Sequence, residues 1–249
     1  MDEFEIYGGF ANVYDEFMDN IPYDQWHVYL KNLLEQCGVN EGIVTELGCG
    51  TGTMTSMLAN DGYDMIGIDI SEEMLEIARD KCPENVLLLH QDMRELELYG
   101  SAAAFVCVCD GMNYILQNDE LALVFENVYR YLDDGGVFIF DMKTKHFYRD
   151  VLGNQTIADN RENASFIWEN EYDEENSINE YLLTIYQLVD CDRDLFERCD
   201  EYHRQRAYDI DEVKDMLTDA GFTCQHIYNA FTGDESGDDS ERVYFVARK

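Results

Sequence analysis

Residues 43–71 read IVTELGCGTGTMTSMLANDGYDMIGIDIS, and this stretch constrains the fold more than any other part of the chain. A short apolar run leads into three glycines at alternate positions, Gly48, Gly50 and Gly52. A helix-like stretch follows, and then a second apolar run that ends at Asp69. This order predicts a βαβ unit whose glycine loop lets a ligand approach the backbone and the N–H groups at the helix start.

The same alternation of apolar runs and helical periods continues to about residue 141. Ser71 is the predicted N-cap of a helix, EEMLEIARDKC, and a helix over residues 119–132 is predicted to end at Gly135 and Gly136. Repetition of strand, helix and strand predicts an α/β fold with a parallel sheet that is covered on both faces. The predicted strands are residues 43–47, 65–69, 86–90, 103–110 and 137–141.

The segment before this unit has a helical period instead. FANVYDEFMDNIPYDQWHVYLKNLLEQCG predicts one or two amphipathic helices, broken near Pro22, which form a helical lid or lead-in over residues 1–41. Its apolar residues available for packing are Val28, Leu30, Leu33 and Leu34.

After Asp141 the period changes again. Three aromatic-rich stretches, ASFIWENEYD, INEYLLTIYQLVD and LFERCDEYHRQR, alternate in polarity and predict an antiparallel β insertion over residues 146–206. Asp209 is a predicted helix cap, and two strands, residues 223–228 and 243–247, complete the chain. Residues 42–145 and 207–249 therefore form the predicted core.

The charge of the chain argues against nucleic acid as a partner. The chain has 249 residues, with 53 acidic and 17 basic side chains, and its formal net charge is −36. Nucleic-acid binding depends on Lys and Arg that neutralise phosphates, and no basic stripe is present, so no nucleic acid is expected as a partner. A simpler interpretation of this charge is solubility.

The eight cysteines lack the spacing of a metal site, so no metal is expected and the thiols are predicted to be reduced and buried. Cys107 and Cys109 alternate on an apolar run and are predicted to face the same side of a strand. No apolar run approaches the roughly 20 residues that a membrane span needs. A soluble, cytoplasmic protein without a membrane partner is expected.

Three nucleotide-handling loops compete for the glycine motif. A P-loop needs Lys and then Ser or Thr after its last glycine, but Thr53 and Met54 follow Gly52. The dinucleotide fingerprint needs glycine at position 53, which makes NAD, and with it a nicotinamide reductase, a poor second candidate. The remaining pattern is G-x-G-x-G preceded by Glu46.

Acidic residues after the next two strands indicate the ligand. Asp69 ends the second strand, where a carboxylate accepts hydrogen bonds from both hydroxyls of a ribose. Asp92 follows the third strand and is placed to accept from an exocyclic amino group, with Met93 beside an adenine face. An adenosine without phosphates, bearing a cationic group suited to an acidic site, is S-adenosylmethionine.

The motifs ELGCGTGTMT, GIDIS, HQDM and VCDGMNYI resemble those of class I S-adenosylmethionine-dependent methyltransferases, over residues 1–145 and the final helix and strands. The resemblance implies a Rossmann-like seven-strand sheet. FANVYDEFMDNIPYDQW is similar to small bacterial methyltransferases whose N-terminal helical segment lies over the cofactor. EYHRQRAYDIDEVKDMLTDAGF resembles the region after the insertion in sugar-amine and glycine N-methyltransferases. One departure is Glu46, where many relatives have Asp.

The resemblance also implies roles for particular residues. The acidic residue at position 46 helps to fix the loop and the amino group of the methionine moiety, and Tyr14 closes over that end. The D-x-x-N pair, Asp110 and Asn113, faces the sulfonium and the acceptor, and the position of His203 suggests a role near the acceptor. For Trp26, packing in the core is the alternative to a role in cofactor binding. The predicted catalytic residues are Asp110, Asn113 and His203. The predicted cofactor-binding residues are Tyr14, Trp26, Glu46, Gly48, Cys49, Gly50, Gly52, Asp69, Ile70, Met74, Asp92, Met93 and Asp110.

The function predicted from the sequence is methyl transfer from S-adenosylmethionine to N or O of a small-molecule acceptor, bound between Asp110, Asn113 and the insertion that caps it. A second hypothesis is a tRNA methyltransferase acting on a wobble nucleoside, against which the net charge weighs. A third hypothesis is a protein that binds S-adenosylmethionine without turnover.

Overall fold

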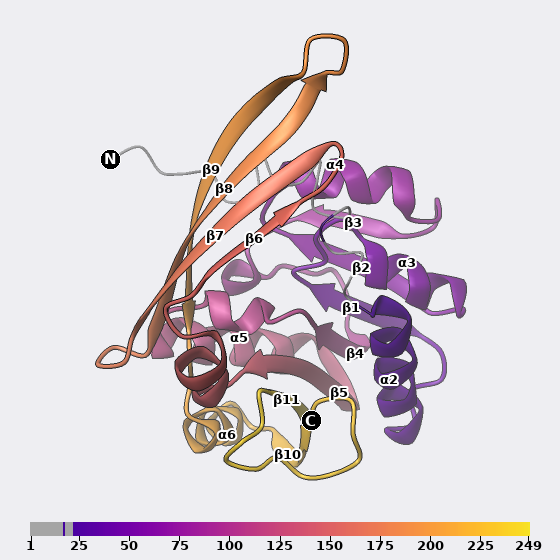
Figure 1. Ribbon diagram of the computed structural model, residues 1–249. Helices are drawn as coiled ribbons and strands as arrows, with labels where there is room; N and C mark the ends of the chain where they lie inside the picture. The colour runs from indigo at the N-terminus through magenta and orange to yellow at the C-terminus, as the bar shows by residue number, and fades with distance from the viewer. Residues whose placement is uncertain (1–16, 18–21) are drawn as a thin grey trace.

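The structure is a computed structural model that describes Phe17 and residues 22–249 (Figure 1). Seven strands form one sheet in the order β10-β11-β5-β4-β1-β2-β3, and four strands form a second sheet in the order β6-β7-β8-β9. The predicted α/β class, with a seven-strand Rossmann-like sheet and an extra antiparallel sheet, is confirmed.

Strands β1 to β5 pair in parallel, and β11 is reversed, since it pairs antiparallel with both β5 and β10. The chain order reverses between β1 and β4, which places a topological switch point at the carboxyl end of β1, where open α/β sheets bind ligands. The strands are β1 (Ile43–Leu47), β2 (Asp64–Asp69), β3 (Leu87–His90), β4 (Ala102–Cys107), β5 (Leu132–Lys143), β10 (Thr223–Asn229) and β11 (Arg242–Arg248).

Helices cover both faces of this sheet (Figure 1). One buried apolar cluster joins α5 and α6 to the sheet, and another joins α2 and α3 to it. Ser71 accepts a hydrogen bond from the Met74 amide and Asp209 accepts one from the Asp211 amide, so both predicted N-caps are present. The helices are α2 (Tyr23–Gln36), α3 (Thr53–Asn60), α4 (Glu72–Lys81), α5 (Asn118–Tyr131) and α6 (Ile210–Asp219).

In α2, Leu30, Leu33 and Leu34 are buried as predicted, but Val28 is exposed. The three leucines share one helical face, and Val28 lies off that face. The prediction that Val28 is available for packing is therefore wrong, whereas the prediction for the three leucines is confirmed.

The second sheet is an antiparallel meander, and its last hairpin is much longer than the first (Figure 1). Three of its strands coincide with the three predicted stretches, whereas β6 was not predicted because its sequence, TIADN, is short and polar. A π-helical segment, Phe147–Leu152, precedes the sheet. The strands are β6 (Thr156–Asn160), β7 (Ala164–Asp173), β8 (Ile178–Asp190) and β9 (Leu195–Arg206).

The segment after β4 differs from the prediction. The strand ends at Cys107, and Cys109 and Asp110 both adopt left-handed backbone angles, with φ of 62° and 56°. A 3-10 helix, η3 (Gly111–Tyr114), follows at once. Cys107 and Cys109 therefore do not alternate along one strand, because the apolar run continues into a turn.

Two smaller predictions are also wrong. The helix expected to end at Gly135 and Gly136 ends at Tyr131, and both glycines lie within the bounds of β5. No disulfide joins any of the eight cysteines, all of which lie among the described residues, but only Cys49 and Cys107 are buried, and Cys191 is exposed because it lies in the turn of the β8–β9 hairpin.

Among the described residues, no helix is long and apolar enough to cross a membrane. Within the same residues, no group of three or more His, Cys, Asp or Glu side chains is arranged to hold a metal ion.

Candidate active site

The glycine loop connects the carboxyl end of β1 to the start of α3. Gly48, Gly50 and Gly52 all have left-handed angles, with φ of 68°, 53° and 75°. A β-carbon at Gly52 would lie 2.7 Å from the Cys82 sulfur, whereas one at Gly50 would have no neighbour within 4 Å. Gly52 therefore lets α3 pack against α4, and Gly50 leaves the loop backbone open to a ligand.

Asp69, at the end of β2, is bound to this loop. Its carboxylate accepts hydrogen bonds from the Gly50 amide at 2.7 Å and from the Ser71 amide at 2.9 Å. Burial raises the pKa of Asp69, although these amides favour the charged form. Because a carboxylate accepts about four hydrogen bonds, Asp69 keeps capacity for ligand hydroxyls.

Glu46 lies beneath the loop, within the core. It is buried and accepts a hydrogen bond from the Thr55 hydroxyl, which ties β1 to the first turn of α3. Burial first, and then the charge of Asp69, raise the pKa of Glu46 to about 8. In the structure its partner is thus a helix side chain that fixes the loop.

Four more of the predicted cofactor residues lie in the loop or in the segments that follow β2 and β3. Ile70 exposes its side chain just beyond β2, whereas Met74 is a buried residue of α4. Cys49 is buried, and its amide donates to the Ile68 carbonyl. The methyl carbon of Met93 lies 3.8 Å from where a β-carbon of Gly48 would be. Ile70 and Met93 therefore offer apolar surface beside the loop.

Asp92 is held by a neighbour that sequence reasoning did not assign to it. Its carboxylate accepts from the Arg94 guanidinium at 2.5 Å and caps a 3-10 helix, Met93–Glu95, through the Arg94 amide. Burial alone would raise the pKa of Asp92, but the bonds from Arg94 lower it. Arg94 also pairs with Glu120 at 2.8 Å, so Asp92 belongs to an ion-pair network on α5.

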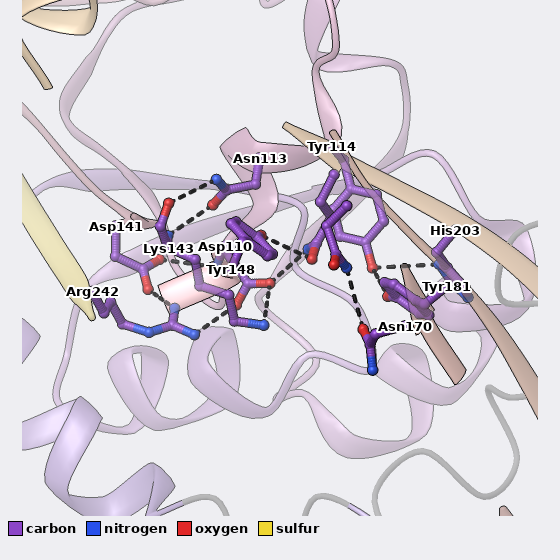
Figure 2. Close-up of polar contacts among 12 residues, drawn as sticks. Asp110, Asn113, Tyr114, Asp141, Lys143, Tyr148, Asn170, Tyr181, His203 and Arg242 are labelled. Carbon is purple, nitrogen blue, oxygen red and sulfur yellow. Dashed lines mark hydrogen bonds and ion pairs between the residues drawn. The ribbon is translucent and has the colours of Figure 1, made fainter. Parts of the chain in front are cut away.

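Asp110 is the centre of a buried charge cluster (Figure 2). Its carboxylate contacts the Arg242 guanidinium at 2.7 Å, the Gln205 amide nitrogen at 2.7 Å and the Lys143 ammonium at 3.2 Å. Arg242 also pairs with Asp141, whose carboxylate accepts from the Asp110 amide. Burial alone would raise the pKa of Asp110, but the charges of Lys143 and Arg242 hold it below its usual value. Asp110 is therefore an ionised anchor.

Trp26 packs against Arg242, a member of this cluster. The Arg242 guanidinium stacks over its ring at 5.0 Å, and Phe231 stacks on the same ring at 5.3 Å. Trp26 is buried in the cluster of α2 and α3, so its described contacts are those of a core residue that supports Arg242.

Asn113 is fully buried, and all the hydrogen bonds of its amide group that the structure gives are to backbone. The nitrogen donates to the carbonyls of Lys143 at 3.1 Å and Arg206 at 2.8 Å, and the oxygen accepts from the Lys143 amide at 3.0 Å. Asn113 thus holds the end of β5 beside the end of β9.

His203 lies on the buried face of the second sheet, two residues before Gln205 on β9. Its Nε2 lies 3.0 Å from Glu201 and its Nδ1 lies 3.4 Å from the Tyr114 hydroxyl. The ring stacks on Tyr181 at 4.6 Å. Because side chains alternate along a strand, Glu201, His203 and Gln205 face the same side.

The same face carries two polar atoms with no hydrogen-bond partner among the described residues, Asn179 Oδ1 and Trp168 Nε1. Asn179 is fully buried, and its nitrogen donates to Asn170 at 3.3 Å. Unsatisfied buried polar atoms are costly, so their presence on one face marks it as a place for a polar ligand. Neither residue was identified from the sequence.

The structure brings Asp110, Asn113 and His203 to the region where β9 meets the carboxyl edge of the large sheet, as the close contacts of Gln205 and Arg206 show. Tyr14 lies outside the described residues. Arg242, Lys143 and Gln205 were missed as functional partners because no local pattern links residues so far apart in sequence.

An open hollow of about 440 Å³ lies elsewhere, around the β7–β8 turn. Half of the residues that line it are carboxylates, and two of the lining residues, Arg204 and Glu180, form an ion pair at 3.0 Å. It contains neither Asp110 nor His203, so the acidic hollow is separate from the site described above.

The sequence of this chain is similar to those of known proteins. Residues 44–136 match the family model described as "Methyltransferase domain". The chain is 35% identical to "Putative methyltransferase YqeM" of Bacillus subtilis (strain 168), over 98% of this chain and 97% of the relative.

Two solved structures share the fold. An S-adenosylmethionine-dependent methyltransferase from Clostridium acetobutylicum has a TM-score of 0.85 and 24% identity, over 97% of this chain and 98% of the other. CalS10, an amino pentose methyltransferase from Micromonospora echinaspora solved with S-adenosylmethionine, has a TM-score of 0.76 and 16% identity, over 95% and 96% of the two chains.

The chain belongs to the class I S-adenosylmethionine-dependent methyltransferases. The resemblance stated from the motifs is thereby confirmed, and the cofactor of this family is S-adenosylmethionine.

Proposed function

We propose that the protein transfers a methyl group from S-adenosylmethionine to a nitrogen or oxygen atom of a small-molecule acceptor. The observation that carries this proposal is the open backbone at Gly50, bonded to the Asp69 carboxylate at the topological switch point. When bound, the cofactor supplies a methyl group on a positively charged sulfur, and the electron pair of the broken bond stays on the sulfur.

The residues around the loop fit this cofactor. Asp69 accepts from ribose hydroxyls, the exposed Ile70 and the nearby Met93 offer apolar surface to the adenine, and Gly50 gives access to the backbone. Glu46 fixes the loop from below through Thr55. The remaining predicted contacts, including Tyr14 of the proposed lid over residues 1–41, belong to the same proposal.

The acceptor is proposed to bind between the Asp110 cluster and the buried face of the second sheet. Gln205 connects the two by its bond to Asp110, and the unpartnered atoms of Asn179 and Trp168 lie on that face. Residues 146–206 then act as the substrate cap, and residues 42–145 with 207–249 act as the part that binds the cofactor.

A small acceptor is favoured over tRNA by the state of the basic residues around the ends of β5 and β9. Lys143 pairs with Asp110, Lys145 with Asp209, Arg204 with Glu180 and Arg206 with Glu212. Each cation is thus neutralised within the chain, whereas binding a polynucleotide requires several Lys or Arg contacts to phosphates.

The test is transfer of label from methyl-labelled S-adenosylmethionine to a small-molecule extract and, separately, to total tRNA. We expect label in the extract, none in tRNA, and no gel shift with tRNA at physiological salt. Label in tRNA would overturn the choice of acceptor. Calorimetric binding of S-adenosylmethionine without transfer to either pool would favour a protein that binds the cofactor without turnover.

A further inference from the structure

A chain of polar side chains runs from the second sheet to the turn after β4 (Figure 2). Glu201 lies 3.0 Å from Nε2 of His203, Nδ1 of His203 lies 3.4 Å from the Tyr114 hydroxyl, and that hydroxyl lies 2.7 Å from the hydroxyl of Tyr181. We propose that Glu201, His203 and Tyr114 form a proton relay that removes the proton from the acceptor atom. This inference rests on the proposed methyl transfer and assigns its base.

Asp110 does not fit the role of base. Its carboxylate already contacts two cations, Lys143 and Arg242, and an amide, and these contacts stabilise the ionised form. Asn113 cannot serve as the base either, because an amide oxygen is hardly basic in water, and this one accepts from the Lys143 amide. The proton acceptor must therefore come from another group at this edge.

Tyr114 is in the right place for the task. It is the last residue of η3, the 3-10 helix that begins directly after Asp110, so its hydroxyl belongs to the turn at the carboxyl edge. From there the relay passes to His203 on β9, a strand that also supplies Gln205 to Asp110. The proposed acceptor site and the relay thus both involve η3 and β9.

The partners of His203 set its tautomer. A carboxylate only accepts hydrogen bonds, so Glu201 fixes the proton of the neutral ring on Nε2. Nδ1 then carries the lone pair and faces the Tyr114 hydroxyl, as an oriented imidazole base requires. The distance of 3.4 Å is long, and catalytic hydrogen bonds commonly shorten when the substrate binds.

The proton inventory balances without any further reactant. The acceptor gives its proton to the Tyr114 oxygen, while the phenolic proton of Tyr114 moves to Nδ1 of His203. The resulting imidazolium is held by Glu201, and it later releases the proton to water. The electron pair left on the acceptor atom forms the new bond to the methyl carbon.

Few titratable groups face this relay from the described elements. Tyr181 of β8 stacks on the ring of His203, Glu201 lies beside it on β9, and Tyr114 approaches from η3. Burial raises the pKa of Tyr181, to which the charge of Asp110 also contributes, so Tyr181 remains a neutral hydrogen-bonding phenol.

A relay of this kind defines the class of acceptor. A carboxylic acid is already ionised at neutral pH and needs no base. The relay serves an acceptor atom that must lose a proton first, namely an ammonium group or an acidic hydroxyl of a phenol or enol.

The first test is the tautomer of His203, measured by 15N NMR on the histidine-labelled protein saturated with S-adenosylhomocysteine at pH 7.5, with His203→Gln as the assignment control. We expect a neutral ring with its proton on Nε2, and a shift of the Nδ1 resonance in Tyr114→Phe. A proton on Nδ1, or on both nitrogens, would overturn the relay, whether or not methyl transfer occurs.

The second test uses label transfer to the small-molecule extract. Tyr114→Phe and His203→Ala are expected to lose about 100-fold or more in rate, the usual contribution of a positioned acid or base, while calorimetric affinity for S-adenosylmethionine stays within about two-fold. Imidazole added to His203→Ala should restore rate in proportion to its free base. Tyr202→Phe, on the opposite face of β9, is the matched control and should keep the wild-type rate.

A rate loss in Tyr114→Phe matched by an equal loss of cofactor affinity, or the absence of any imidazole rescue, would contradict the relay and leave these residues a structural role. Absence of label transfer by the unaltered protein would instead refute the proposed function, and the NMR result would still decide the geometry of the relay.

Discussion

At the glycine loop, the proposed cofactor meets a backbone that carries no side chain at three positions, beside the Asp69 carboxylate. On the buried face of the second sheet, the groups that face the proposed acceptor are side chains from three strands, two of them with unpartnered polar atoms. Backbone binding depends on chain geometry and tolerates few residue types, whereas side-chain binding changes with every substitution. The glycine loop is therefore suited to a ligand that is the same in all proteins of this fold. The face of the second sheet is suited to a ligand that differs from one protein to another.

The largest expected effect lies where the two regions meet. Arg242→Met leaves Asp110 and Asp141 buried without the guanidinium that neutralises them, and we expect the free energy of unfolding to fall by about 3–5 kcal/mol. Urea unfolding measures this loss. Arg198→Met removes an exposed pair with Asp200 and should change little. Equal stability of the two variants would show that the two regions do not depend on the cluster.

Two glycines of one loop are expected to behave differently. Gly52→Ala combines a left-handed angle with a close approach to Cys82, and it should cost about 2–4 kcal/mol of stability. Gly50→Ala has open space, so it should cost only about 1–2 kcal/mol of stability and mainly weaken cofactor binding. Thermal unfolding and calorimetry separate the two effects. Unchanged cofactor affinity in Gly50→Ala would argue against backbone binding at this position.

Removal of the Asp69 carboxylate beside the glycine loop is expected to have a somewhat smaller effect, and this effect is on cofactor affinity. Asp69→Ala removes the proposed ribose hydrogen bonds and the bond to the Gly50 amide, and affinity for S-adenosylmethionine should fall by about 1.5–3 kcal/mol in calorimetry. Asp64→Ala, at the exposed start of the same strand, is the matched control. An unaltered affinity in Asp69→Ala would place the cofactor elsewhere.

The last comparison concerns pH and Glu46, which supports the loop from below and whose effect is smallest per unit of pH. The folded pKa of Glu46 is raised to about 8, so between about pH 5 and 8 the folded protein keeps a proton that the unfolded chain has lost. Its contribution to stability is thus present at low pH and falls as pH rises. Glu46→Gln cannot ionise, so its stability relative to wild type should rise by up to about 1.4 kcal/mol per pH unit across this window.

Urea unfolding at pH 5, 7 and 9 measures this slope, with exposed Glu41→Gln as the control. A parallel pH dependence of Glu46→Gln and wild type would mean that Glu46 remains ionised in the folded protein.

The loop region was predictable because its signal is local. Three glycines in five residues and an acidic residue at the next strand end lie within residues 43–71, directly before the helix that Ser71 caps. Periodicity likewise located β7, β8 and β9, since long alternating strands carry a strong pattern. The polar five-residue strand β6 carried none.

The acceptor region was predictable only in outline. His203 was identified, but Glu201 and Tyr114 were not, because strand register and a turn after β4 bring them together. The left-handed pair Cys109 and Asp110 was taken for strand, since its apolar neighbours hide the turn. Arg242 contacts Asp110 across 132 positions of sequence, a pairing that only the folded sheet reveals.

The amide of Asn113 has a consequence for how such proteins diversify. It holds the carbonyl at which the chain leaves the large sheet, Lys143, next to the carbonyl near which it returns, Arg206. An intervening segment whose two ends are fixed side by side can be lengthened or exchanged at little entropic cost to the rest of the fold. A single buried asparagine thus fixes the two ends of residues 146–206 side by side, so the length and sequence between them can change without displacing β5 or β9 at their ends.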